Sequence, residues 1–189
     1  SKVPLINGAI DAMMALKFLQ SHPRSNGKFG TTGHSRGGTN SFYLSDIKFT
    51  SKFIEGTKGF DAILPEAAEC RMAGFFAEPE LTSNTTLLVV HGGADDWTLA
   101  KFCKEHAERI KASPGKVKID IKEGWYHVWH AGKKPWREKM AMTLHDCPDF
   151  YVDNEGRFTN PIWVEWMVNK HKKYACLLYT SPSPRDNPA

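Results

Sequence analysis

The chain lacks the features that mark membrane proteins and nucleic-acid-binding proteins. No apolar run approaches the ~18 residues that a membrane-spanning helix needs, and the longest, around residues 86–90, has the length of a strand. Neither sign of charge dominates, because 25 Lys and Arg stand against 21 Asp and Glu, a formal net charge of +4 in 189 residues. This mixed charge argues against a nucleic-acid partner. We therefore expect neither a membrane span nor bound nucleic acid.

Cysteine is scarce and its spacing is uninformative. There are 4 cysteines and no C-x-x-C pair, so a structural zinc site is not indicated. One of them, Cys176, lies in a terminal string that we exclude below, and an odd number remains. The sequence thus predicts no disulfide framework, and Cys103 is expected to be a small buried apolar residue. No targeting leader can be read, so a cytoplasmic and an exported location both stay open.

The C-terminal residues do not look like part of a fold. Residues 176–186 read CLLYTSPSPRD, which resembles the translation of a transposase sequencing adapter. We interpret residues 176–189 as read-through of library DNA and expect them to be disordered. Residues 1–175 are then expected to form a single partial domain, which the length also favours.

The rest of the chain alternates between helix and strand patterns. A helix over 7–20, with Asn7 as its N-cap, has few polar breaks and is expected to be largely buried. Residues 116–122 alternate strictly between polar and apolar, as in a half-exposed edge strand. Further expected strands are 28–33, 60–64 and 86–91, and further expected helices are 99–111 and 162–174. This alternation predicts an α/β fold with a mostly parallel sheet flanked by helices.

The first chemical signal is a serine between glycines. Residues 33–37 read Gly33-His34-Ser35-Arg36-Gly37, a G-x-S-x-G pattern at a predicted strand-to-helix turn. Such a turn exposes the serine, and the two glycines would let the strand and the helix approach each other. It also directs the N–H of Arg36, at a helix N-terminus, to where an oxyanion would form. The pattern alone is weak, and its plain alternative is a glycine-rich turn.

An acid and a base follow the next strands. Asp95 lies in the glycine loop after the strand 86–91, and His127 follows the strand 116–122. Side chains just beyond the carboxyl ends of parallel strands converge on one crevice, so both are expected beside Ser35. The neighbouring Asp96 is expected to cap the following helix instead. His130 is the nearest rival to His127 but lies further from the strand end.

The order serine, acid, histidine is the chain order of α/β hydrolases. The blocks GHSRGG, HGGADDWT and GWYHVWH resemble the signature blocks of the dienelactone hydrolase family, over residues 9–130. The resemblance implies the α/β-hydrolase fold, with Ser35 as nucleophile, Asp95 as acid and His127 as base, and no metal or organic cofactor. It also implies a small-molecule ester or lactone substrate, cleaved through an acyl-enzyme.

The sequence departs from that family in three ways. Dienelactone hydrolase proper uses cysteine where this chain has Ser35, which favours a broader esterase. Leu99 stands where the family often has proline. The strands that precede the serine turn in this fold are missing, and one of their loops supplies the second oxyanion donor. We therefore expect a fragment of a longer enzyme.

Two other functions stay open at this point. One is metal-assisted hydrolysis with His91, Asp95, His127 and His130 as ligands, although their spacing matches no metal motif. The other is a non-catalytic relative that binds a ligand against aromatic side chains, although those side chains could equally be packing residues. These aromatic residues are Trp97, Trp125, Tyr126 and Trp129. The identity of the ester and the oligomeric state cannot be read from the sequence.

Overall fold

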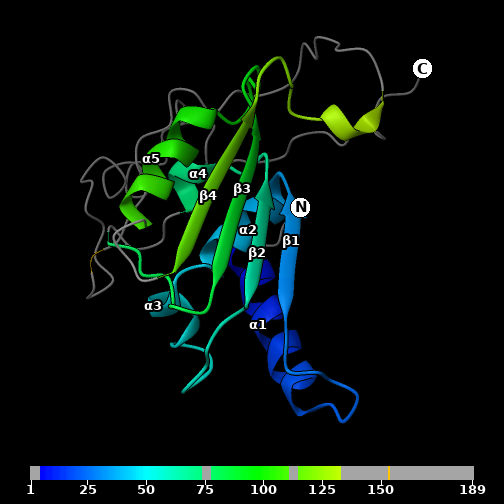
Figure 1. Cartoon of the computed structure of the whole chain (residues 1–189), viewed down its shortest axis with the longest axis vertical. Coiled ribbons are helices and arrows are strands. Elements are labelled where there is room, and N and C mark those ends of the chain that lie inside the picture. Colours follow the sequence, from blue (N-terminus) through cyan, green and yellow to red (C-terminus); the bar gives the residue numbers. More distant parts are fainter. Residues whose placement is uncertain (1–4, 74–77, 111–114, 133–152, 154–189) are drawn as a thin grey trace, which may run out of the picture.

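A parallel β-sheet forms the centre of the molecule (Figure 1). The computed structural model describes residues 5–73, 78–110, 115–132 and 153. Its four strands, all parallel, lie in the order β1-β2-β3-β4, so β1 and β4 are the edges of the described sheet. The strands are β1 (Gly30–His34), β2 (Ala62–Glu66), β3 (Thr86–Gly92) and β4 (Lys116–Lys122). Because the strands are parallel, all four carboxyl ends lie at one end of the sheet.

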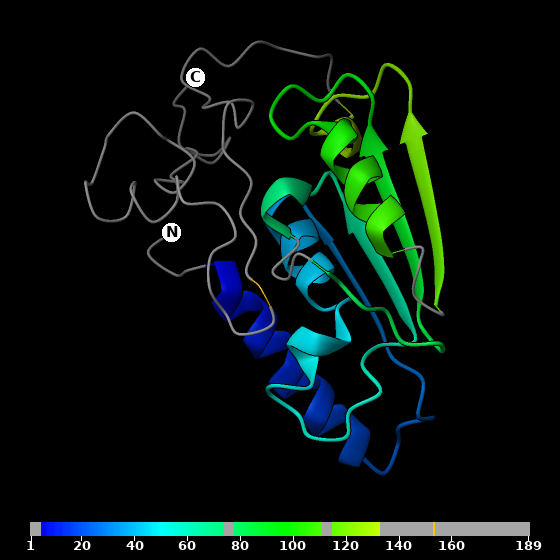
Figure 2. The same ribbon diagram turned by 90° about the vertical axis from the view of Figure 1, so that its left-hand side faces the viewer.

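Helices connect the strands, and α1, α2 and α5 lie on the same side of the sheet (Figure 2). The described helices are α1 (Leu5–Ser21), α2 (Arg36–Tyr43), α3 (Ile47–Thr50), α4 (Cys70–Ala73), α5 (Ala100–Ile110) and the 3-10 helix η1 (Trp129–Ala131). The core lies between these helices and the sheet. In β3, Leu87 and Val89 are fully buried, whereas alternate residues are partly exposed. One face of the strand therefore carries most of its packing.

Most of the predicted elements are confirmed within a few residues. The expected strands 28–33, 60–64, 86–91 and 116–122 correspond to β1 to β4, and the helix 99–111 corresponds to α5. Among the described strands β4 lies at an edge of the sheet, and its side chains are exposed or partly exposed, as its strict alternation predicts. The helix expected over 162–174 and residues 176–189 lie outside the described residues. None of the helices described has the combination of length and apolar character that crossing a bilayer requires.

Two expectations for α1 are wrong. The helix already includes Leu5, so Asn7 is an interior residue and not its N-cap. Only one stripe of the helix is buried, through Ala9, Met13 and Leu16, and this stripe packs toward α2. Other apolar side chains are exposed, at 44% for Met14, 65% for Phe18 and 46% for Leu19. The scarcity of polar breaks showed that the helix is apolar, but not which of its faces a neighbour covers.

The expectation of no disulfide is also wrong, although Cys103 is buried as expected. Cys70 and Cys103 form a disulfide with a Cα–Cα distance of 4.8 Å, and both side chains are buried. The disulfide joins α4 to α5 across 33 residues of sequence. Only the packing of the two helices brings the sulfur atoms together, and no short-range spacing could show this. The link fixes the segment after β2 against the helix that follows β3.

Candidate active site

Ser35 lies at a sharp turn between β1 and α2. Its backbone angles are φ 54° and ψ −115°, so it adopts a positive φ that residues other than glycine rarely take. Two backbone hydrogen bonds hold it there: its N–H donates to the Glu66 carbonyl at 2.8 Å, and its own carbonyl accepts from Thr39 N–H at 2.9 Å. A strained residue that its surroundings hold in place is typical of functional sites. The side chain is partly exposed at the carboxyl end of β1.

The glycine requirement of this turn differs from the predicted one. A Cβ atom on Gly33 would lie 2.3–2.8 Å from the backbone of Gly37, so no side chain fits at position 33. A Cβ atom on Gly37 itself would meet nothing within 4 Å, which contradicts the expected steric role of that glycine. The second tight contact occurs at Gly38, where a Cβ would lie 2.4 Å from the Glu66 carbonyl oxygen. The strand–helix approach thus requires Gly33 and Gly38.

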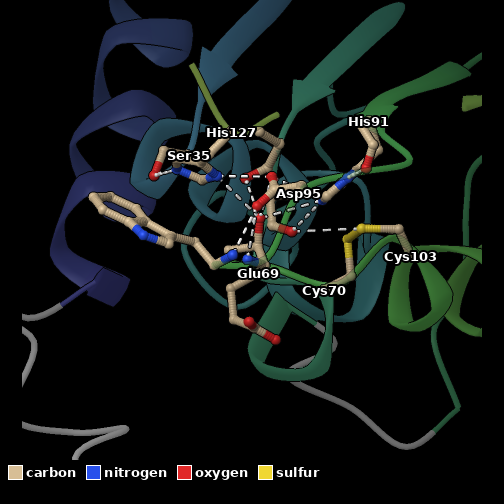
Figure 3. A network of polar contacts seen from close by, with 12 residues as sticks. Ser35, Glu69, Cys70, His91, Asp95, Cys103 and His127 are labelled. Atoms are coloured by element: carbon tan, nitrogen blue, oxygen red, sulfur yellow. Dashed lines mark hydrogen bonds and ion pairs between the residues drawn. A yellow bond between two sulfur atoms is a disulfide. The ribbon is translucent and has the colours of Figure 1, made fainter. Parts of the chain in front are cut away.

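The structure brings Ser35, His127 and Asp95 together in a hydrogen-bonded row (Figure 3). His127 Nε2 lies 2.8 Å from Ser35 Oγ, and His127 Nδ1 lies 2.8 Å from Asp95 Oδ2. The carboxylate can only accept, so Nδ1 carries the proton and Nε2 accepts the hydrogen bond of the serine hydroxyl. His127 is 5% exposed and Asp95 is 4% exposed, so the base and the acid are shielded from water, whereas Ser35 is partly exposed.

Asp95 accepts hydrogen bonds on both carboxylate oxygens. Oδ1 accepts from the backbone N–H groups of Trp97 and Thr98, each at 3.0 Å, and Oδ2 accepts from the Thr98 hydroxyl at 2.9 Å as well as from His127. Burial by itself raises the pKa of this carboxyl, but the contacts with His127 and Thr98 outweigh it. The net pKa of Asp95 therefore lies below its usual value, and the group stays ionised.

Asp96 and Trp97, the two residues after Asp95, differ in their contacts. Asp96 is exposed and lies four residues before Ala100, the first residue of α5, so it is not the cap of that helix. The side-chain bonds to the backbone of this turn are made by Asp95, which accepts from the N–H groups of Trp97 and Thr98. Trp97 packs its ring against His127, with centroids 4.9 Å apart at an interplanar angle of 39°. The base is thus held by a hydrogen bond at one edge and by an aromatic ring at one face.

Sequence reasoning missed two buried polar residues at this site. Thr98 Oγ1 contacts Asp95 and also lies 3.2 Å from His127 Nδ1, and its position three residues after an aspartate is a common turn signal that could have identified it. Glu69 is 6% exposed; its carboxylate accepts from Arg71 N–H at 3.0 Å, and its N–H donates to Thr39 Oγ1. Nothing in its local sequence marks Glu69.

Glu69 differs from Asp95 in its ionisation. Burial raises the pKa of Glu69 to about 7, and the negative charge of Asp95 acts in the same direction. Arg71 and its N–H oppose this shift without cancelling it. The site therefore places a carboxyl that titrates near neutral pH close to a carboxylate that stays charged.

The residues considered as metal ligands are not arranged as a ligand set. His91 is fully buried, with its ring nitrogens 3.0 Å from the Gly92 carbonyl and 3.3 Å from the Ala68 carbonyl. His130 lies on η1, where its ring packs on His34 at a centroid distance of 4.4 Å. Within residues 5–73, 78–110, 115–132 and 153, no group of three or more His, Cys, Asp or Glu side chains is placed to hold a metal ion.

The remaining predicted site residues lie around the same strand ends. Arg36 is the first residue of α2, which places its N–H next to Ser35 at the positive end of that helix. Trp125 and Tyr126 are 39% and 46% exposed in the loop before His127. Trp129 stacks on Trp125 at a centroid distance of 5.3 Å. The aromatic residues thus surround the histidine loop, and only part of their surface is packed.

No protein-family model matches the sequence, and a comparison with curated proteins gives no match either. Solved structures do match. Esterase 2 of Thermogutta terrifontis, phosphoramylated by tabun, is 15% identical over 68% of this chain and 57% of its own, with a TM-score of 0.51. Its propionate-bound form gives a TM-score of 0.52 and is covered over 58% of its length. Dipeptidyl peptidase 4 of Porphyromonas gingivalis is 17% identical over 65% of this chain and 20% of its own, with a TM-score of 0.50.

These similarities concern the fold. The chain spans less than three fifths of the esterase that it matches, and the sequence identity is low. In this chain a parallel sheet carries a strained serine after β1, an acid after β3 and a histidine after β4. The described part of this chain has the α/β-hydrolase fold.

Proposed function

We propose that the protein is a serine hydrolase that cleaves a carboxylic ester or lactone through an acyl-enzyme. The observation that carries this proposal is the row Ser35–His127–Asp95, with both hydrogen bonds at 2.8 Å. Three side chains from separate loops have the contacts and the protonation pattern that turn a serine hydroxyl into a nucleophile.

The first half of the reaction acylates the enzyme. Ser35 Oγ attacks the carbonyl carbon while His127 Nε2 takes the hydroxyl proton, and Asp95 stabilises the imidazolium that results. The tetrahedral oxyanion is held by the backbone N–H of Arg36. When the intermediate collapses, the C–O bond to the leaving group breaks and His127 gives its proton to the departing alkoxide. The acyl group remains on Ser35.

The second half reverses these roles with water. His127 takes a proton from a water molecule, whose oxygen attacks the acyl carbon, and the new tetrahedral intermediate releases Ser35. His127 returns the proton to Ser35 Oγ, and the carboxylic acid leaves. The positions of Thr98 and Trp97 support this cycle, because they hold the acid and the base in place while the charge moves.

The substrate class rests on resemblance. The three sequence blocks favour a dienelactone-hydrolase-like enzyme, and serine in place of cysteine favours a broader esterase. Esterase 2 of Thermogutta terrifontis, which has the same fold, has been solved phosphorylated by paraoxon and bound to propionate. Covalent phosphorylation and a bound short acid are what a serine hydrolase of small esters would show. We therefore propose a small ester or lactone as substrate.

The test combines covalent labelling with hydrolysis. A fluorophosphonate probe should label the wild-type chain, and the chain should hydrolyse p-nitrophenyl acetate or butyrate. Ser35→Ala should abolish labelling and lower kcat/KM by at least ~10³-fold. Ser51→Ala is the matched control, because Ser51 is an exposed serine remote from the row along the chain. A folded wild-type chain that neither labels nor hydrolyses these esters would favour the ligand-binding alternative. A chelator that removes activity while labelling persists would favour the metal-assisted one.

A further inference from the structure

His34, the residue before the nucleophile, contacts the loop that carries the histidine base. Its Nε2 lies 2.7 Å from the backbone carbonyl oxygen of His127. Its ring also packs against the rings of His127, Trp129 and His130, at centroid distances of 5.2, 5.5 and 4.4 Å. The half-buried imidazole thus joins the end of β1 to the segment after β4, although His34 and His127 are 93 positions apart in the sequence.

The loop that carries His127 is anchored at its start by backbone hydrogen bonds and at His127 by the contacts of the imidazole ring. It begins after Lys122, the last residue of β4, and turns at Gly124, whose φ is +73°. The Trp125 carbonyl accepts from Ala94 N–H at 3.0 Å, which ties the start of the loop to the acid loop. Within the described residues, the backbone carbonyl of His127 accepts a hydrogen bond from His34 Nε2. The backbone at the base itself is therefore held by a side chain and not by the sheet.

We propose that His34 is a positioning residue, which holds His127 in register with Ser35 by donating a hydrogen bond to the His127 backbone carbonyl. Two consecutive residues then contact one histidine: Ser35 bonds its ring and His34 bonds its backbone. A carbonyl oxygen only accepts, so the Nε2 of His34 carries the proton. This uses the variable position of the G-x-S-x-G pattern to set the geometry of the catalytic row.

The electrostatics of His34 agree with this arrangement. Burial lowers the pKa of His34, and the charges of His127 and His130 act in the same direction, whereas the hydrogen bond to His127 and the nearby Glu66 oppose the shift. The neutral ring is therefore favoured, and it can hold its single proton on Nε2 against the carbonyl. No positive charge is added next to the base that must accept the serine proton.

The bond from His34 affects the rate through the distance between His127 Nε2 and Ser35 Oγ. Proton transfer needs His127 Nε2 within hydrogen-bond reach of Ser35 Oγ, and a displacement of about 1 Å can cost up to ~10²-fold in rate. Without the bond from His34, we expect the loop to sample displaced positions and kcat to fall roughly tenfold. KM should change little, because His34 acts on the base and need not touch the substrate.

The experiment compares His34→Gln with His34→Met in the full chain. The two side chains have nearly the same length and volume, but only glutamine carries an N–H group that can reach the His127 carbonyl. We expect roughly tenfold lower kcat for H34M, at an unchanged KM, and recovery to within about threefold of wild type for H34Q. Thermal unfolding shows whether both variants are folded. If H34M does not fold, His34→Asn replaces it, since its amide is too short to reach.

A second readout does not depend on catalysis. The Nδ1–H proton of His127, which donates to Asp95, can be followed by ¹H–¹⁵N NMR and assigned by its loss in His127→Gln. We expect a slowly exchanging signal in wild type and H34Q and a broadened or absent signal in H34M. Equal kcat and equal signals in H34M and wild type would overturn the proposal, as would a failure of H34Q to recover either.

The kinetic part of this test rests on the proposed hydrolase function, and the NMR part does not. If the wild-type chain hydrolyses no ester and takes no fluorophosphonate label, the proposed function fails. The His127 signal in the three proteins then still decides whether His34 holds the histidine loop. If esters are hydrolysed but H34M behaves as wild type, the function stands and the role of His34 is rejected.

Discussion

Two buried carboxyl groups at the same end of the sheet have pKa values shifted in opposite directions. Asp95, in the β3–α5 loop, is 4% exposed and has a lowered pKa, whereas Glu69, just before α4, is 6% exposed and has a pKa raised to about 7. Burial disfavours the charge in both. The difference lies in the donors: Asp95 accepts from the His127 ring, from the Thr98 hydroxyl and from two backbone N–H groups.

Burial raises the pKa of both carboxyls, and the hydrogen bonds that each accepts decide which of them keeps its charge. Glu69 accepts a recorded hydrogen bond from Arg71 N–H and lies within the field of Asp95, which opposes a second negative charge nearby. Asp95 stays charged next to His127, the base that needs a negative partner. Glu69 gains a proton near neutral pH. Substitutions of Asp95 and of Glu69 test this comparison directly. A substitution of an exposed carboxyl elsewhere tests whether burial is needed for the effect.

The largest effect is expected at Asp95. In Asp95→Asn the side-chain oxygen still accepts from Trp97 and Thr98, but its amide would face His127 Nδ1 and favour the wrong tautomer. His127 then presents a proton to Ser35 instead of a lone pair, and kcat should fall by ~10⁴-fold with the fold retained. Ester hydrolysis and thermal unfolding measure both effects. Asp96→Asn, in the exposed neighbour, should stay within about twofold of wild type; a similar loss there would contradict the assignment of Asp95.

At Glu69, we expect that removing the charge makes the folded protein more stable. Its folded pKa, about 7, lies above the 4.5 of an ordinary glutamate, so the folded state keeps a proton that the unfolded chain loses as the pH rises between these values. The stability of the wild type therefore falls across that window and stays lowered above it. Glu69→Gln removes this cost. It should raise the free energy of unfolding by about 3 kcal/mol at pH 8 and by almost nothing at pH 4.

Urea unfolding at the two pH values measures this difference. Glu55→Gln is the matched control, because Glu55 is exposed and its substitution should leave the free energy of unfolding almost unchanged. If E69Q changed the stability equally at pH 4 and pH 8, the Glu69 carboxyl would not change its charge between these values, and the contrast with Asp95 would be lost.

The smallest effect is expected at Asp61, at the opposite end of the sheet. Its Oδ2 accepts from Phe29 N–H at 2.8 Å, and Lys28 Nζ lies 3.4 Å from Oδ1, with side chains 32% and 77% exposed. The hydrogen bond from Phe29 is the main cause of its lowered pKa. The associated stability is present above the ordinary aspartate pKa and is lost as the pH falls through the lowered value.

Asp61→Asn keeps the acceptor for Phe29 and removes the charge that faces Lys28. At pH 7 the free energy of unfolding should change by less than ~0.5 kcal/mol, and the change should shrink in 1 M salt, because an exposed ion pair is screened. Chemical unfolding at low and high salt measures it. A salt-independent loss above ~1 kcal/mol would show that charge matters as much at this exposed end as at the buried one.

Much of the fold and of the candidate site could be predicted from local patterns in the sequence. The apolar run of β3, the alternation of β4 and the amphipathic stripe of α5 each appear in consecutive residues, so they were predicted to within a few positions. Ser35, Asp95 and His127 each follow a strand, and the geometry of a parallel sheet explains why they meet. Thr98 was missed despite a local signal, whereas the other missed features join distant segments. The Cys70–Cys103 disulfide and the packing of Glu69 behind Asp95 depend on how α4 and α5 approach, which no short window of sequence records.

The sequence by itself determined the parallel α/β order and the three side chains at the strand ends, because periodicity and turn chemistry act between neighbouring residues. Tertiary structure decided which faces of α1 are covered, that close approach requires Gly38 and not Gly37, and that His34 reaches the backbone of His127. It also decided the charge of the two buried carboxyls. Such features depend on distances of a few ångströms between segments remote in the chain, and packing sets those distances.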